Sequence, residues 1–246
     1  KFNFELIAPN NDSTGMIRYN AETVQTNFAD STVFTNIGTP APYNINQQVF
    51  FEIIANRQNI PSGIWRLRIY GYSVVVEKYN IWLPVTEIAT RNTYFLNPSI
   101  NTTLTLPSTA KNVITVGGYN SLTNSISDFS GRGYTRKYEI VKPDIVAPAY
   151  NITTANTSRG YTPQTGTSIA APFVTGSCSI LMEWGIVQGN DPFMYGQKLK
   201  AYLRLGAARD NNITYPNREW GYGRLCLANV FNNLKIPSII NTAQIS

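Results

Sequence analysis

The chain has 246 residues, which suits one large or two small domains, and 43% of them are hydrophobic, enough for a packed core. Only 14% are charged and the net charge is +6, with Lys and Arg scattered along the chain, so nucleic acid is not an expected partner. We also expect no membrane span, because no apolar run looks long enough to cross a bilayer.

Residues 1–95 are predicted to form an all-β, jelly-roll-like sandwich. Side chains alternate between the two faces of a strand, so a period of two in apolar residues indicates strands. The clearest example is 63–70, and weaker strands are expected near residue 4, near residue 51 and over 77–85. Strand ends between 20 and 46 cannot be placed. The apolar residues that carry this alternation are Phe2, Phe4, Leu6, Val49, Phe51, Ile53, Trp65, Leu67 and Ile69.

Residues 96–246 change to alternating strands and helices, which indicates an α/β domain. Short apolar runs at 112–118 and 141–148 are typical of buried sheet strands. Helices are predicted over 167–186, from Asp191-Pro192 to about Leu205, and over 227–234.

Two cysteines, Cys178 and Cys226, are too few for a disulfide framework. Buried thiols are the default expectation, with one bridge between them left open. Asp128 and Asp144 are expected to have structural roles. No segment is dense enough in carboxylates to assign a metal, and no cofactor is expected.

The string Gly166-Thr167-Ser168-Ile169-Ala170-Ala171-Pro172 has the features of a nucleophile at the start of a helix. The first amides of a helix are unpaired and its dipole favours negative charge, so the Ser168 amide can meet a developing oxyanion. Gly166 permits a close backbone approach, and the small residues after Ser168 let the helix pack tightly. The hydroxyl of Thr167 either assists the oxyanion at longer range or caps the helix.

Three further strings precede this one in a fixed order: Val113–Gly118, Asp128–Gly133 and Lys142–Pro148. Together the four strings closely resemble the subtilisin-like serine proteases (subtilases), over about residues 97–234. The upstream β-sandwich resembles the insert of a clostridial subgroup that includes spore-germination proteases. A secreted, cell-surface or spore-associated bacterial protein is therefore expected.

The resemblance implies a subtilisin-like α/β fold and a serine endopeptidase that acts on proteins or peptides through an acyl-enzyme on Ser168. It implies an oxyanion donor at the Ser168 amide, with Thr167 and Gly166 in support. Gln164, Thr165 and Gly131 are predicted to contact substrate. Phe173 stands where many subtilases have a histidine that is not the general base, which implies altered packing.

The chain contains no histidine, so it cannot supply the general base of a Ser-His-Asp triad. In subtilases the acid, the histidine and the oxyanion asparagine precede the serine. We expect this chain to be a C-terminal piece, cut at Lys1, of a protein whose preceding half supplies them, and we expect the piece alone to be inactive.

Two alternatives stay open at this point. One is a pseudoprotease that serves as a binding or regulatory module. The other is a carbohydrate-binding sandwich that uses exposed aromatic side chains, although packing is the favoured role for Trp65. The aromatic residues concerned are Trp65, Tyr70, Tyr72, Tyr79 and Trp82.

Overall fold

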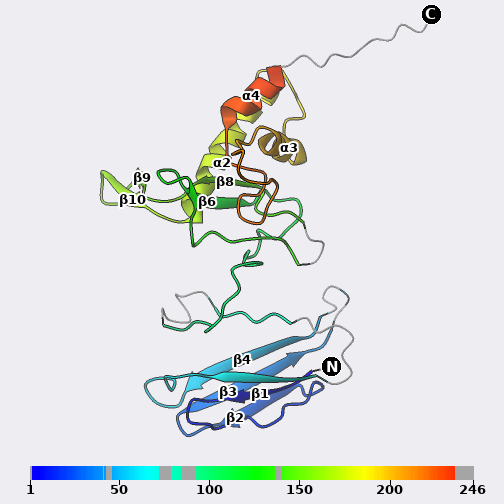
Figure 1. Ribbon diagram of the computed structural model, residues 1–246, viewed down its shortest axis with the longest axis vertical. Coiled ribbons are helices and arrows are strands. Elements are labelled where there is room, and N and C mark those ends of the chain that lie inside the picture. Colours follow the sequence, from blue (N-terminus) through cyan, green and yellow to red (C-terminus); the bar gives the residue numbers. More distant parts are fainter. Residues whose placement is uncertain are drawn as a thin grey trace, which may run out of the picture. The chain divides into compact units, whose positions relative to one another are not determined.

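The computed structural model describes residues 2–40, 42, 46–71, 79–84, 92–136 and 140–235. The chain divides into two compact units, Lys1–Ala89 and Thr90–Ser246 (Figure 1). The boundary predicted from the sequence lies between residues 95 and 96. Each unit has its own core and is described by itself.

The described part of the first unit is built from antiparallel strands, as predicted. Strands β1 and β5 form one sheet, and β2, β3 and β4 form another in that order. Alternation along β3 explains the core, because Val33 and Ile37 are buried while Asn36 is exposed. The strand bounds are β1 (Phe2–Ile7), β2 (Thr23–Asn27), β3 (Ser31–Gly38), β4 (Gln48–Ala55) and β5 (Arg66–Gly71).

The prediction of a strand over 77–85 is wrong for residues 79–84, which have no strand structure. The remaining residues of that segment lie outside the described ranges. Strands β2 and β3 lie within residues 20–46, where no strand bounds were predicted from the sequence. Whether the sheets form a jelly roll stays a prediction.

The second unit has α/β structure around a parallel strand pair. Its sheet has the order β7-β6-β8, and β6 pairs with β8 in parallel from Val116↔Ile145 to Tyr119↔Pro148. The hairpin of β9 and β10 projects from the body of this unit (Figure 1). The strands are β6 (Val116–Asn120), β7 (Ser125–Ile126), β8 (Ile145–Pro148), β9 (Ile152–Ala155) and β10 (Tyr161–Gln164). The helices are α2 (Thr167–Met182), the π-helix η1 (Glu183–Val187), α3 (Gln197–Leu205) and α4 (Leu227–Lys235).

The predicted helix after Ser168 is confirmed, but the next helix begins later than expected. The carboxylate of Asp191 accepts a hydrogen bond from the amide of Phe193 at 3.1 Å, which forms a local turn instead of a helix start. Gly196 follows with a φ of 55°, and α3 begins only at Gln197. The strands over 112–118 and 141–148 are shorter than expected, because 112–115 and 141–144 are loops.

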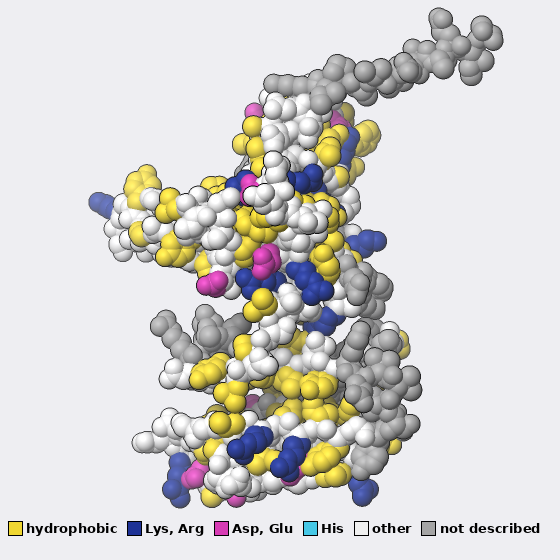
Figure 2. All heavy atoms as spheres, viewed as in Figure 1, with side chains coloured by type: hydrophobic (Ala, Val, Ile, Leu, Met, Phe, Trp, Pro, Cys, Tyr) yellow, Lys and Arg dark blue, Asp and Glu magenta, His cyan; other side chains and the backbone are white. Residues whose placement is uncertain are grey.

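Helix α2 packs against both β6 and β8. The spacing of its buried residues at three or four positions places them on one face, as an amphipathic helix requires. These residues are Ala170, Val174, Ser177 and Leu181. A flank of the helix carries exposed apolar side chains, among them Phe173 and Ile180, at 41% and 47% exposure. Hydrophobic side chains also reach the surface around the helices of this unit in Figure 2.

Candidate active site around Ser168

Ser168 is the second residue of α2, and its side chain is exposed. Strand β10 ends at Gln164, so the hairpin leads the chain directly into the helix start. Amides in the first helical turn have no partner within the helix, and the dipole places partial positive charge there. An oxyanion formed beside the Ser168 hydroxyl would therefore meet an unpaired amide and a favourable field.

Gly166 fixes the turn before the serine. Its φ of 151° lies in a region that residues with a Cβ rarely adopt. Its amide donates to the carbonyl of Ala149 at 2.9 Å, and its carbonyl accepts from the amide of Ile169 at 3.0 Å. Gly166 therefore joins the residue that follows β8 to the first turn of α2.

Thr167 packs against β6 at Gly118, a residue without a side chain. A Cβ on Gly118 would lie 3.5 Å from Thr167 Cγ2 and only 2.6 Å from Ala149 Cβ. Glycine at 118 is thus required for α2 and the chain after β8 to approach β6 this closely. Thr167 makes no capping hydrogen bond and Gly166 is the N-cap residue, so the capping alternative for the Thr167 hydroxyl is wrong.

The predicted substrate contacts lie in two places. Gln164 and Thr165 are exposed and adjoin the serine turn, and Thr165 Oγ1 accepts from the amide of Asn151 at 2.9 Å. Gly131 lies against a different segment, since a Cβ there would be 3.4 Å from both the Leu104 side chain and the Thr103 carbonyl. The structure thus groups Gln164 and Thr165 with Ser168, and all three substrate roles stay predictions.

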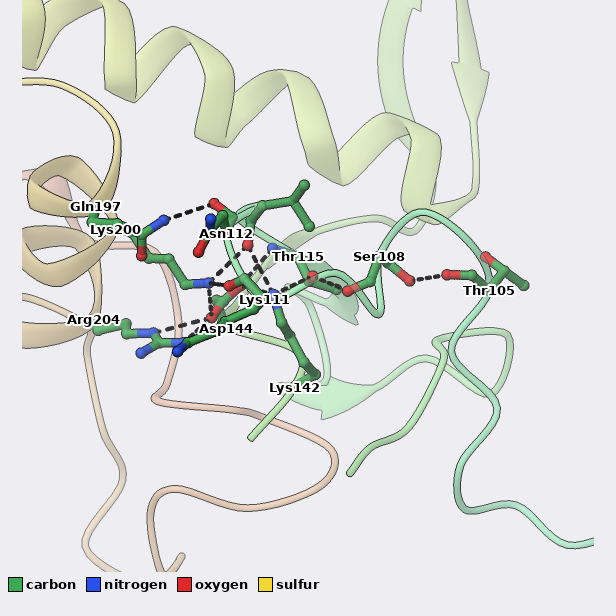
Figure 3. Close-up of polar contacts among 11 residues, drawn as sticks. Thr105, Ser108, Lys111, Asn112, Thr115, Lys142, Asp144, Gln197, Lys200 and Arg204 are labelled. Atoms are coloured by element: carbon green, nitrogen blue, oxygen red, sulfur yellow. Dashed lines mark hydrogen bonds and ion pairs between the residues drawn. The ribbon is translucent and has the colours of Figure 1, made fainter. Parts of the chain in front are cut away.

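A buried ionic cluster centred on Asp144 was not predicted from the sequence (Figure 3). Asp144 accepts from Lys142 Nζ and from the Thr115 amide, both at 2.7 Å, and from Arg204 Nε at 3.0 Å. Lys200 Nζ lies 3.2 Å from Oδ1 of Asp144, the oxygen that also accepts from Arg204. Burial alone raises the pKa of Asp144, but the hydrogen bonds from Lys142, Thr115 and Arg204 outweigh it and hold the pKa below its ordinary 3.8. This pairing favours a structural role for Asp144.

The segment that carries Ser168 and the Asp144 cluster also matches a known family in sequence. The profile of the peptidase S8 group, described as the subtilase family, matches residues 87–223, more than half of the chain. The chain belongs to the subtilase family.

Solved and curated subtilases extend this result. The Clostridium perfringens CspB protease is 38% identical, with a TM-score of 0.84 over 95% of this chain and 49% of that chain. The PII-type proteinase of Lactococcus lactis subsp. cremoris is 38% identical over 38% of this chain and 5% of its own length. The minor extracellular protease Vpr of Bacillus subtilis is 26% identical over 51% of this chain and 16% of its own length. This chain thus spans about half or less of each of these proteins.

Two acidic residues of this subtilase chain, Asp128 and Asp144, have surroundings of their own. Asp128 is exposed in the turn after β7, and Asp144 is committed to its cluster. Within the described ranges, no group of three His, Cys, Asp or Glu side chains could hold a metal ion. None of the 246 residues is histidine, so these residues alone contain no Ser-His-Asp triad.

One helix of the subtilase unit bears on the expectation that the chain has no membrane span. The continuous helix Thr167–Val187 has a mean hydropathy of 1.3 and is long and apolar enough to cross a membrane by length and composition. The core helix of a water-exposed protein meets the same criterion. Ala170, Val174 and Leu181 of this helix lie in the core of the unit.

The two cysteines are free thiols, so the bridge left open by the sequence is not formed. Both are half-buried, which is less burial than expected. Burial raises the pKa of the Cys178 thiol, which makes it a poor nucleophile near neutral pH.

The aromatic residues considered for sugar binding have different surroundings. Trp65 is half-buried, lies 6.3 Å from the ring of Phe28 and donates Nε1 to the Pro61 carbonyl at 3.1 Å, which agrees with a packing role. Tyr70 donates to a carboxylate oxygen of Glu5. Tyr79 and Trp82 are exposed, and Tyr72 lies outside the described residues.

Proposed function

We propose that this chain carries the nucleophile of a serine endopeptidase and that Ser168 is that nucleophile. The observation that carries the proposal is the position of Ser168, exposed at the second residue of α2 behind a turn that requires glycine. Membership of the subtilase family supports the same assignment. The substrate class is a protein or peptide, and no cofactor is needed for this chemistry.

The proposed reaction proceeds through an acyl-enzyme. A histidine base takes the proton of Ser168 Oγ while the oxygen attacks the scissile carbonyl carbon, and the oxyanion accepts from the Ser168 amide. The C–N bond then breaks as the histidine returns the proton to the leaving amine. Water, activated by the same base, hydrolyses the ester and restores the serine. Gln164 and Thr165 adjoin the serine turn and are proposed to contact the bound peptide. Gly131, which lies against Thr103 and Leu104, is proposed as a further contact.

The base and its acid partner are proposed to come from a part of the protein that precedes Lys1. Support comes from the CspB protease, of which this chain covers 49%. Support also comes from the exposed apolar residues of the second unit, since large apolar side chains gathered on one helix usually contact a partner surface. Those on α2 and η1 are Phe173, Ile180, Met182, Ile186 and Val187. The isolated chain is accordingly proposed to be inactive.

An active-site-directed fluorophosphonate probe tests the assignment. The longer protein should be labelled, and Ser168→Ala should abolish both labelling and peptide hydrolysis, because the nucleophilic oxygen is lost. Ser121→Ala, at an exposed serine in the turn after β6, should behave as the native protein. The isolated chain should show labelling no higher than its Ser168→Ala variant, since loss of the base lowers turnover by about 10⁶ in subtilisin.

A pseudoprotease is the second candidate, favoured by the lack of histidine in these 246 residues. It predicts that the longer protein remains unlabelled although it is folded. Labelling at a serine other than Ser168 would contradict the proposed nucleophile under either candidate. An extracellular location is proposed from relatives such as Vpr, whose name describes an extracellular protease.

A further inference from the structure

Lys142 binds the main chain just before β6 from a fully buried position. Its ammonium donates to the Val113 carbonyl and to Thr115 Oγ1 at 2.8 Å each, and to Asp144 at 2.7 Å. An ammonium group has three protons to donate, so these three acceptors use all of them. The side chain is 0% exposed, and no proton of this group is left for water.

Lys200 reaches the same segment from α3 and is 4% exposed. Its ammonium donates to the carbonyls of Lys111 and Val113 at 2.8 Å each, beside Asp144. Gln197, one turn earlier in α3, donates to the carbonyl of residue 112 at 3.0 Å. Three consecutive carbonyls, 111–113, are thus held by side chains that come from elsewhere in the sequence (Figure 3).

The buried cluster contains more positive than negative charges. Lys142 and Asp144, which lie just before β8, face Lys200. Arg204 follows Lys200 by one turn in α3 and binds the same carboxylate. Arg204 also lies over the ring of Tyr222, at 4.4 Å from its centroid. Three cations therefore surround one carboxylate, and neighbouring like charges in a buried site disfavour the protonated form of a lysine.

We propose that Lys142, Lys200 and Asp144 form a clamp on residues 111–113, and that this clamp tightens as the pH rises from neutral to mildly alkaline. Loss of one proton relieves the repulsion between the two ammonium groups. The neutral amine of Lys200 keeps two N–H groups, enough for the carbonyls of Lys111 and Val113. The clamp does not depend on the proposed catalytic activity.

The direction of the pH effect follows from linkage. Burial, together with the charge of Lys142, lowers the pKa of Lys200 from 10.5 to about 8 in the closed segment. In an opened segment Lys200 is hydrated and returns toward 10.5. The open form therefore binds more protons between these two values, and raising the pH through them favours the closed form.

The clamp lies at one end of the strand pair whose other end leads to Ser168. Strands β6 and β8 begin directly after Thr115 and Asp144, whose backbone groups also pair at 2.8 Å. At the other end, the residue after β8 binds Gly166. A tight clamp therefore fixes the strand pair on which the serine turn is mounted.

Limited proteolysis of this chain by trypsin tests the clamp. Trypsin recognises the exposed Lys111 but can cleave the Lys111–Asn112 bond only when the clamped carbonyl is released. When opening is fast relative to cleavage, the cleavage rate follows the population of the open form. The Arg159–Gly160 bond, in the exposed turn between β9 and β10, is the reference. The ratio of the two rates cancels the pH dependence of trypsin itself.

The native ratio should fall about 25-fold between pH 7 and pH 9.5, as pKa values of about 8 in the closed form and 10.5 in the open form require. Lys200→Arg, whose charge does not titrate in this range, should give a ratio that does not change with pH. Lys200→Met, which removes the ammonium even if arginine does not fit, should raise the ratio at pH 7 and abolish the response. Lys198→Met changes a partly exposed lysine of the same helix and should keep the native response. A pH-independent native ratio, or a native response in Lys200→Met, would overturn the proposal.

Discussion

The amide of Gly166 donates a 2.9 Å hydrogen bond to the carbonyl of Ala149, which ties the turn before Ser168 to the chain that leaves β8. In this turn Gly166 has a φ of 151°. A Cβ there would meet no atom closer than the Ser168 amide nitrogen at 3.9 Å. The need for glycine is therefore conformational and not a matter of space.

Gly166→Ala should lower the free energy of unfolding of the second unit by about 1–3 kcal/mol, the cost of holding a Cβ-bearing residue in this region. Urea unfolding followed by circular dichroism measures the change. Gly176→Ala, in the exposed middle of α2 where a Cβ meets nothing within 4 Å, is the matched control. It should be neutral or stabilising by up to about 1 kcal/mol. Equal effects of the two variants would show that Gly166 is not strained.

Leu181→Ala should destabilise the second unit by about 2–5 kcal/mol, because Leu181 is fully buried and its removal leaves a cavity. Ile180→Ala, at the next position on the exposed side of α2, should cost much less in the isolated chain. Urea unfolding of both variants measures this contrast. In the longer protein, the cost of Ile180→Ala should rise if a preceding segment covers this side of the helix.

Asp144→Ala should destabilise the second unit by about 3–5 kcal/mol, because it leaves three cations around a site that has lost its carboxylate. Asp210→Ala is the control, since Asp210 pairs with Arg224 at the surface, with about a third of its side chain exposed. That change should cost roughly 0–1 kcal/mol. Similar losses for both variants would argue against a special role of the buried cluster.

Acid should remove the stabilisation that Asp144 supplies. The folded pKa of Asp144 is lower than 3.8, so the carboxylate stabilises the fold above that pH, and the stabilisation disappears as the pH falls through the folded pKa. The unfolding free energy of the native chain minus that of Asp144→Asn should be constant above about pH 5 and shrink below pH 3.8. Urea unfolding between pH 2.5 and 6 measures this difference. A difference that stays constant to pH 2.5 would contradict the assignment.

Local patterns predicted several elements of this chain. The helix after Ser168 follows from a continuous run of apolar and small residues. In α4, apolar residues instead recur every three or four positions, as in an amphipathic helix. Strands β1, β4 and β5 follow from alternation with a period of two. The hairpin of β9 and β10 was missed, because its strands carry mainly polar and exposed residues and lack an apolar pattern.

The sequence by itself determined the family and the candidate nucleophile, because both depend on short strings whose residues act on their immediate neighbours. Only the tertiary structure decided the surroundings of Asp144. Its partners Thr115 and Arg204 are 29 and 60 positions away, so no local pattern relates them. Lysines are usually solvated, and burial of Lys142 and Lys200 is stable only where folding brings a carboxylate and free carbonyls to both ammonium groups.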